Sequence, residues 1–283
     1  MTEGDGVETA SLFPAEAFAV LSNETRVAIV ETLAEESGLS FAELRKRVGV
    51  SDAGQFNYHL SKLQDRFVSK RDGEYHPQYA ALRAVGAIRS GIYTSGSTTE
   101  TKETDYDCPT CESLLTATYD RGKLFLECDE HEKVFQTMVP PTAASNRTIE
   151  ALLSYANAEV QRDIEHTVDG NCHICTGPLS CSSPERPENL LQVVLSCENC
   201  WNYMHLPVAV TVVRHPAVVS LYHDHGIDVR SEPLLSLDFV RDPESASVLS
   251  EDPVRMRVTV ELGEDTLQLT LDGELNVLET ERE

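Results

Sequence analysis

Apolar side chains recur at helical spacing in the first part of the chain. Between residues 27 and 34 they lie three or four positions apart, and Ser22 or Asn23 precedes them as a candidate helix cap. The segment Ser40-Phe-Ala-Glu43 has the sequence of a capping box and predicts a second, shorter helix, which Gly49 ends. Two consecutive short helices are therefore expected here.

A third helix is expected directly after Ser51, which we expect to cap it. Its core-facing positions follow the helical period at Phe56, Leu60 and Leu63. Because only about four residues separate it from the preceding helix, the pair has the pattern of a helix-turn-helix. The residues from Val68 to His76 surround the turn dipeptide Asp72-Gly73 and predict a tight β-hairpin, which we interpret as a wing.

The remaining two thirds of the chain have a more irregular pattern. Residues 94–107 contain almost no apolar side chains and predict a linker, whereas residues 146–166 have one apolar helical face. Alternating positions in 254–262 and 266–271 predict a C-terminal β-hairpin. The expected fold class is α+β, with a winged helix-turn-helix domain at 1–93, the linker at 94–107, a zinc ribbon at 108–139, a connecting helix at 140–168 and a second zinc-binding, C-terminal α+β domain at 169–283.

The charge balance indicates a protein adapted to concentrated salt. The 283 residues include 47 acidic and 23 basic side chains, for a net charge of −24, and only six of the basic residues are Lys. This composition is typical of a halophilic protein that must stay hydrated, with an ordinary acidic protein as the alternative. No apolar run is long enough to span a membrane and the N-terminus is acidic, so we expect a cytoplasmic protein with no membrane partner.

One part of this acidic chain is basic. Residues 40–90 have a net charge of +4, whereas residues 91–283 have −21. A basic segment at a predicted helix-turn-helix indicates a polyanionic partner, and we expect double-stranded DNA. The expected DNA-contacting residues are exposed positions of the third helix and the cations around it: Arg45, Lys46, Ser51, Gln55, Asn57, Tyr58, Lys62, Lys70 and Arg71.

The side-chain types in this set suit two kinds of contact. Gln and Asn can bond adenine with two hydrogen bonds, whereas Lys and Arg hold phosphates. His59 lies on the flank of the third helix, where a half-packed histidine is expected rather than a base contact. The alternative is that all these residues are solvated positions on a winged helix that docks onto proteins.

Seven of the eight cysteines and one histidine fall into two sets with metal-ligand spacing. Sixteen residues separate the pairs of the first set, and twenty-one separate those of the second. Two such pairs can place four soft ligands tetrahedrally, as zinc requires, and in a reducing compartment they indicate metal rather than disulfides. We expect two structural zinc sites, with the ligands Cys108, Cys111, Cys128, His131, Cys172, Cys175, Cys197 and Cys200. Cys181 remains as a free thiol or a substitute ligand.

Several of these strings resemble a known family. Residues 21–26 (Leu-Ser-Asn-Glu-Thr-Arg), the capping-box segment and His59-Leu60 resemble ArsR-like winged helix-turn-helix transcriptional regulators. Residues 51–60, 215–219 and 222–226 are similar to regulators of halophilic archaea that join this domain to a Cys-rich, zinc-ribbon-like C-terminal region. The resemblance implies a homodimer formed through helices near 13–21 and 78–92 and bound to a palindromic site. It implies no known small-molecule effector.

We therefore expect a sequence-specific transcriptional regulator rather than an enzyme. The sequence contains no Gly-rich phosphate loop and no nucleophile or metalloprotease motif. His223 and His225 alternate on a short predicted helix, so their side chains are expected to point apart. One alternative is a protein-interaction adaptor built from the same modules, and another is a zinc or redox sensor in which Cys181 and a labile site change the affinity for DNA.

Overall fold

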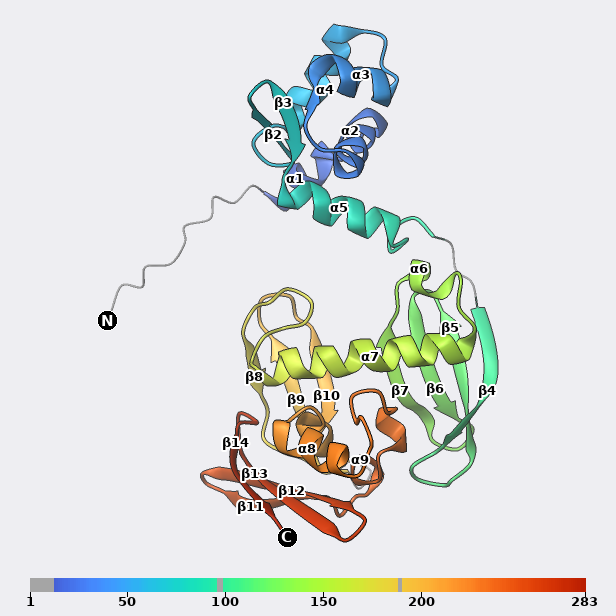
Figure 1. Ribbon diagram of the computed structural model, residues 1–283, viewed down its shortest axis with the longest axis vertical. Helices are drawn as coiled ribbons and strands as arrows, with labels where there is room; N and C mark the ends of the chain where they lie inside the picture. Colours follow the sequence, from blue (N-terminus) through green and yellow to red (C-terminus); the bar gives the residue numbers. More distant parts are fainter. Residues whose placement is uncertain (1–12, 96–98, 188–189) are drawn as a thin grey trace, which may run out of the picture. The chain divides into compact units, whose positions relative to one another are not determined.

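A computed structural model describes residues 13–95, 99–187 and 190–283 (Figure 1). The chain divides into two compact units, Met1–Ser95 and Gly96–Glu283. Both units combine helices with antiparallel sheets, which confirms the expected α+β class.

The N-terminal unit packs helices against a small sheet. The helices are α1 (Pro14–Val20), α2 (Glu24–Glu35), α3 (Phe41–Val48), α4 (Ala53–Leu63) and α5 (Tyr79–Arg89). The strands are β1 (Leu39–Ser40), β2 (Val68–Arg71) and β3 (Glu74–Pro77), in the order β1-β3-β2. The core combines apolar residues of α2, α3 and α4, among them Ile29, Leu33, Leu44, Phe56, Leu60 and Leu63, all at most 1% exposed.

Single residues set the ends of these elements. The predicted capping box of α3 is present, and Gly49 ends the helix with φ of 80°. Asp72 and Gly73 both have positive φ, as the predicted tight hairpin between β2 and β3 requires. The cap of α4 differs from the prediction, because the side chain of Asp52, not Ser51, accepts a hydrogen bond from the Gln55 backbone N–H at 2.6 Å.

The C-terminal unit begins with a four-stranded sheet, in the order β4-β5-β6-β7. Its strands are β4 (Thr99–Asp107), β5 (Leu114–Asp120), β6 (Lys123–Cys128) and β7 (Glu132–Met138). The prediction of a linker over 94–107 is therefore wrong for Thr99–Asp107. This edge strand is held by backbone pairing with β5 and most of its side chains are exposed, so its polar sequence gives no strand signal. The Thr104 hydroxyl also donates a hydrogen bond to the Leu115 carbonyl.

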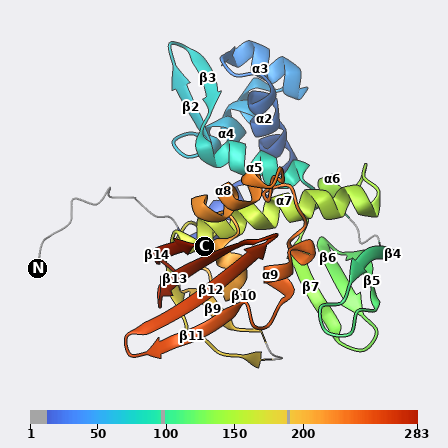
Figure 2. The ribbon, with the colours of Figure 1, turned by 60° about the horizontal axis from the view of Figure 1, so that its bottom comes forward.

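A long helix, α7 (Ile149–Val168), follows the short α6 (Pro141–Ala144) and connects two cores. Its first half packs Ile149, Leu152 and Leu153 against the β4–β7 sheet, whereas Ile164 belongs to the core of the segment that follows. Figures 1 and 2 show α7 running from the first sheet to the strands β8 (Leu179–Cys181), β9 (Gln192–Cys197) and β10 (Tyr203–Pro207). Both Asn157 and Gln161 of α7 donate to the Glu232 carbonyl at 2.9 Å and so fix the loop before Leu234.

The rest of the unit contains two further sheets and short helices. One sheet has the order β10-β9-β8, from β8 (Leu179–Cys181), β9 (Gln192–Cys197) and β10 (Tyr203–Pro207). The helical segments are η2 (Val208–Val212), α8 (Pro216–Asp224), η3 (Leu234–Ser236) and α9 (Asp238–Arg241). The predicted hairpin forms the centre of a larger sheet made of β11 (Ala246–Glu251), β12 (Val254–Leu262), β13 (Asp265–Asp272) and β14 (Val277–Arg282).

Candidate metal centres and nucleic-acid interface

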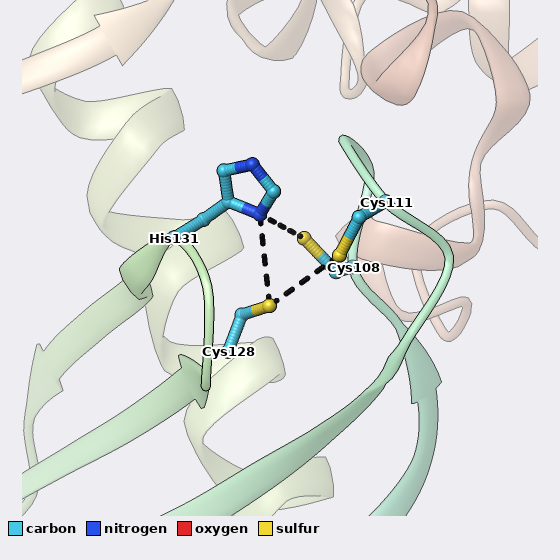
Figure 3. A group of neighbouring side chains, drawn as sticks. All are labelled: Cys108, Cys111, Cys128 and His131. Carbon is cyan, nitrogen blue, oxygen red and sulfur yellow. Dashed lines mark hydrogen bonds between the residues drawn. The ribbon is translucent and has the colours of Figure 1, made fainter.

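The structure brings the first predicted ligand set together at one end of the β4–β7 sheet (Figure 3). Cys108 and Cys111 lie in the loop between β4 and β5, Cys128 ends β6, and His131 lies in the turn before β7. The Sγ atoms of Cys111 and Cys128 are 3.5 Å apart, and Nδ1 of His131 is 3.7 Å from the sulfurs of both Cys108 and Cys128. These four donor atoms form a cluster that can hold a metal ion.

The second set forms a matching cluster beside the β8–β10 sheet. Cys172 and Cys175 lie between α7 and β8, Cys197 ends β9, and Cys200 lies in the turn before β10. The Sγ atoms of Cys172 and Cys200 are 3.6 Å apart, as are those of Cys175 and Cys197. In each cluster all four donor atoms lie within 4.8 Å of one another. Cys181 belongs to neither cluster; it is half-buried, and this burial raises the pKa of its thiol.

The ligand loops that begin at Cys108, Cys172 and Cys197 share one backbone design. The N–H of Cys108 donates to the Ser113 carbonyl five residues on, and the N–H of Glu112 donates back to the Cys108 carbonyl. The loops that begin at Cys172 and Cys197 have the same two bonds, all between 2.8 and 2.9 Å. The residue that donates back adopts positive φ in each loop: Glu112, Thr176 and Trp201. The two clusters thus have this loop in common.

Hydrogen bonds to the sulfurs of Cys111 and Cys175 favour the thiolate form that metals bind. The Ser113 hydroxyl lies 3.0 Å from Cys111 Sγ, and this bond, with one from the Ser113 backbone, lowers the pKa of Cys111 to about 6. The Gly177 backbone and the Asn199 side chain lower the pKa of Cys175 to about 6 in the same way. A Cβ at Gly177 would lie 3.0 Å from the Asn199 Cβ and 3.3 Å from Cys175 Sγ, so this loop needs glycine.

The supporting residues Ser113, Gly177 and Asn199 were not predicted from the sequence. Their signal in the sequence is position alone, because each lies two residues after or one residue before a ligand cysteine. Each cluster offers four protein donors, the number that a tetrahedral metal site needs.

The exposed face of α4 contains most of the residues predicted to contact bases. Gln55, Asn57, Tyr58 and Lys62 are exposed, with 56% of Tyr58 accessible and the Lys62 ammonium 5.8 Å from its ring centre. His59 is 8% exposed and packs with the core, so it does not lie on this face.

The predicted phosphate contacts are divided among different surfaces. Arg45 is half-buried and donates to the Ser51 carbonyl, so it stabilises the turn before α4, whereas Lys46 is exposed. Lys70 and Arg71 are neighbours on β2 and therefore point to opposite faces of the hairpin. The Lys70 ammonium lies 5.2 Å from the ring centre of Tyr75, on the face toward the core.

Comparison with known proteins places the chain in a family. No curated protein and no solved structure matches it. Residues 14–88 match a domain of unknown function, DUF7347, and residues 105–277 match another, DUF7351. The fold thus defines the chain as a two-unit α+β protein with two clusters of Cys and His side chains. The DUF7351 match covers more than half of the chain, so the chain belongs to the DUF7351 family. Within the described parts of the chain, no helix has the length and apolar character needed to cross a membrane.

Proposed function

We propose that this protein is a sequence-specific DNA-binding transcriptional regulator with two structural zinc ions. The observation that carries the proposal is the exposed face of α4, which presents Gln55, Asn57, Tyr58 and Lys62. This face lies in the one basic segment of a chain whose net charge is −24. Amide side chains can read adenine edges in the major groove, and the cations beside them neutralise phosphates.

The arrangement of α3, α4 and the β2–β3 hairpin supports a winged helix-turn-helix assignment. Residues 49–52 form the short turn between α3 and α4, and Arg45 ties this turn to α3. In this motif the second helix enters the major groove of DNA, and the hairpin contacts the neighbouring sugar-phosphate backbone of the DNA. Because Lys70 lies against the Tyr75 ring, Arg71 has the better position for a phosphate contact, on the hairpin face that it shares with Glu74.

Exposed apolar side chains on α1 and near α5 support a homodimer. Phe18 is 73% exposed, and Tyr79, Leu82, Ile92 and Tyr93 are all exposed in the same unit. Monomers rarely leave so many large apolar groups in water, and a two-fold dimer would bury them. Such a dimer would present two copies of α4 to a palindromic DNA site.

The sulfur spacings support zinc as the metal. With Zn–S bonds of about 2.3 Å, two ligands of a tetrahedral site lie about 3.8 Å apart. The closest sulfur pairs here are 3.5 and 3.6 Å apart, and the donors are thiolates and one imidazole. A bound zinc ion supplies folding free energy to each module, while Ser113 and Asn199 orient and activate the thiolates that hold it.

Genome-wide occupancy mapping of the native protein tests the proposal. A regulator gives discrete peaks with a shared palindrome, and the peaks of a chromosomal Asn57→Ala, Tyr58→Ala strain should weaken or disappear although the protein level is unchanged. Asn146→Ala, at an exposed position of the C-terminal unit, provides a matched control outside the reader face. Uniform occupancy without a shared motif would refute sequence-specific binding.

One observation favours the adaptor as a second candidate function. Trp201 and Tyr203, beside the second cluster, are 85% and 67% exposed. Residues 187–213 contain no Lys or Arg to accompany them, so this surface suits a protein partner better than a nucleic acid. Occupancy that survives the double change on α4 but is lost on Trp201→Ala would support this candidate instead.

A further inference from the structure

A hollow of about 560 Å³ lies on the N-terminal unit, outside the face of α4. It is formed by the β2–β3 hairpin, the loop before β1 and the start of α5. Ser69 and Arg71 share one face of β2 because they are two residues apart, and His76 pairs with Ser69 across the hairpin. The side chains around the hollow are Ser37, Ser69, Arg71, His76, Pro77, Gln78 and Tyr79.

The loop before β1 reaches the hairpin through Gly38. This residue has φ of +81° and donates its N–H to the Tyr75 carbonyl at 3.0 Å. A Cβ here would lie 3.2 Å from a Glu74 carboxylate oxygen and 3.4 Å from the His76 ring, so glycine allows the close approach. As a result the Ser37 hydroxyl lies 3.0 Å from Nδ1 of His76, 39 residues away in the sequence.

Hydrogen-bond donors dominate the chemistry of the hollow. Every polar side chain that lines it can donate a hydrogen bond: three hydroxyls, a guanidinium, an imidazole and an amide. Among the described residues of its lining there is no carboxylate, in a chain with twice as many acids as bases; Glu74 is the acid next to it. With the Ser37 hydroxyl donating to Nδ1 of His76, Nε2 carries the proton and is free to donate to a ligand.

The first turn of α5 adds backbone N–H groups to these donors. Gln78 is the N-cap of this eleven-residue helix and Tyr79 its first residue, and both line the hollow. The Gln78 side chain makes no capping hydrogen bond with any described residue. The first N–H groups of α5 therefore contribute to the attraction of an anion that Arg71 and His76 already favour.

We infer that this hollow binds a phosphate group through Arg71, Ser69 and Nε2 of His76, whose ring the Ser37 hydroxyl orients. The phosphate can belong to the DNA backbone, in which case the inference rests on the proposed function, or to a phosphorylated small molecule. The volume of 560 Å³ leaves room for the organic part of such a molecule beyond its phosphate.

Inorganic phosphate is the probe for the hollow itself. Phosphorus NMR of phosphate titrated with the metal-loaded full chain should show saturable broadening. Ser69→Glu, which adds a carboxylate to the hollow, and Arg71→Ala should each weaken this binding at least about tenfold. Arg83→Ala removes the same charge from the exposed side of α5 and should leave the titration unchanged. Circular dichroism verifies that each variant is folded, and identical titrations for all four proteins would overturn the inference.

A short random-sequence duplex distinguishes the two sources of phosphate. The slope of log affinity against log salt is measured above the salt concentration of tightest binding. If the hollow holds a DNA phosphate, Ser69→Glu and Arg71→Ala each reduce this slope by about 0.9. If the slope is unchanged while phosphate binding is lost, the ligand is a small molecule. If the wild-type protein binds phosphate but no DNA, the proposed function is contradicted and the phosphate-binding role of the hollow is supported. Wild-type protein that binds DNA but no phosphate would contradict this inference alone.

Discussion

The Ser113 hydroxyl lies 3.0 Å from Cys111 Sγ, close enough to stabilise the thiolate that a metal ion needs. Ser113→Ala removes this bond, so the pKa of Cys111 should rise and protons should compete better with the metal. We expect the affinity of the first cluster for zinc to fall by about 10-fold or more at neutral pH. Competition with a chromophoric chelator measures this affinity directly.

Asn199→Ala is the matched control, because Asn199 Nδ2 has the equivalent role beside Cys175 at 3.5 Å. Each variant should weaken one cluster and leave the other unchanged. Equal weakening of both sites by either variant would show that the effect is a general loss of stability rather than a local one.

We expect the purified protein to contain bound zinc. Elemental analysis of the purified protein should find about two zinc ions per chain, and Cys111→Ser or Cys175→Ser should each remove one. Because the metal supplies folding free energy to its module, each change should also unfold the loops of its own cluster, as hydrogen exchange would detect. One zinc or none in the wild-type protein would refute the two-site proposal.

Local sequence signals predicted those features in which one residue decides the backbone. Gly49 and Asp72-Gly73 adopt the positive φ that their turns need, and Ser40 with Glu43 forms the expected box. Ser51 and Asp52 are both capable caps, and the sequence does not show which of two neighbours will accept the hydrogen bond. The Cys and His ligands were predictable because a four-ligand site requires those residue types at short, fixed spacing.

Features that depend on distant pairing were not predictable. The strand β4 has a polar sequence and is defined only by its backbone bonds to β5. The outer strands β11 and β14 likewise join the predicted hairpin as edges with few buried positions. The Ser37–His76 contact spans 39 residues, and no local pattern indicates that these two side chains meet.

The reader face of α4 gives a direct test by substitution. Asn57→Ala and Tyr58→Ala should each lower the affinity for the specific site by about 1–3 kcal/mol per lost base contact and leave the fold intact. Lys70→Ala and Arg71→Ala should weaken binding to all DNA sequences alike, with the larger effect at Arg71. Titrations against the specific duplex and a scrambled one separate the two classes. A base-reading role for Asn57 fails if Asn57→Ala weakens both duplexes equally.

Acid should weaken one contact of the C-terminal sheet. His225 Nε2 lies 2.8 Å from Asp265 Oδ2, and this bond, with a further one from Arg282, lowers the pKa of Asp265 below its ordinary value. The folded protein therefore holds fewer protons at Asp265 than the unfolded chain, whose aspartate pKa is about 3.9. The stabilising contribution is present above this value and is lost as the pH falls through the lower pKa of the folded state.

Urea unfolding of the wild type and of Asp265→Asn at a series of pH values measures this contribution by difference. The wild type should be the more stable protein at neutral pH, and the difference should shrink as the pH falls below about 4. Since the pair is partly exposed, high salt should also reduce the difference. A difference that stays constant with pH would show that the carboxylate charge has no part in it.

The dependence of DNA binding on salt follows from the distribution of charge. Residues 40–90 have a net charge of +4, while the −21 of residues 91–283 is tethered to them. At about 1 M salt the Debye length is about 3 Å, so the acidic part scarcely repels DNA held at α4, and affinity depends on hydrogen bonds and packing. At about 0.01 M the repulsion extends about 30 Å, and the acidic part also repels itself and loosens its fold.

We therefore expect specific affinity to reach a maximum at or above several tenths molar salt instead of rising steadily on dilution. For an ordinary DNA-binding protein, counterion release makes affinity rise as salt falls over the whole range. An operator titration from about 0.1 to 2 M KCl, with circular dichroism to follow folding, distinguishes the two behaviours. If the wild-type protein stays folded and gains affinity steeply at every dilution, the repulsion between its acidic surface and DNA is too weak to oppose counterion release. That outcome would show that the acidic surface is not an adaptation to salt.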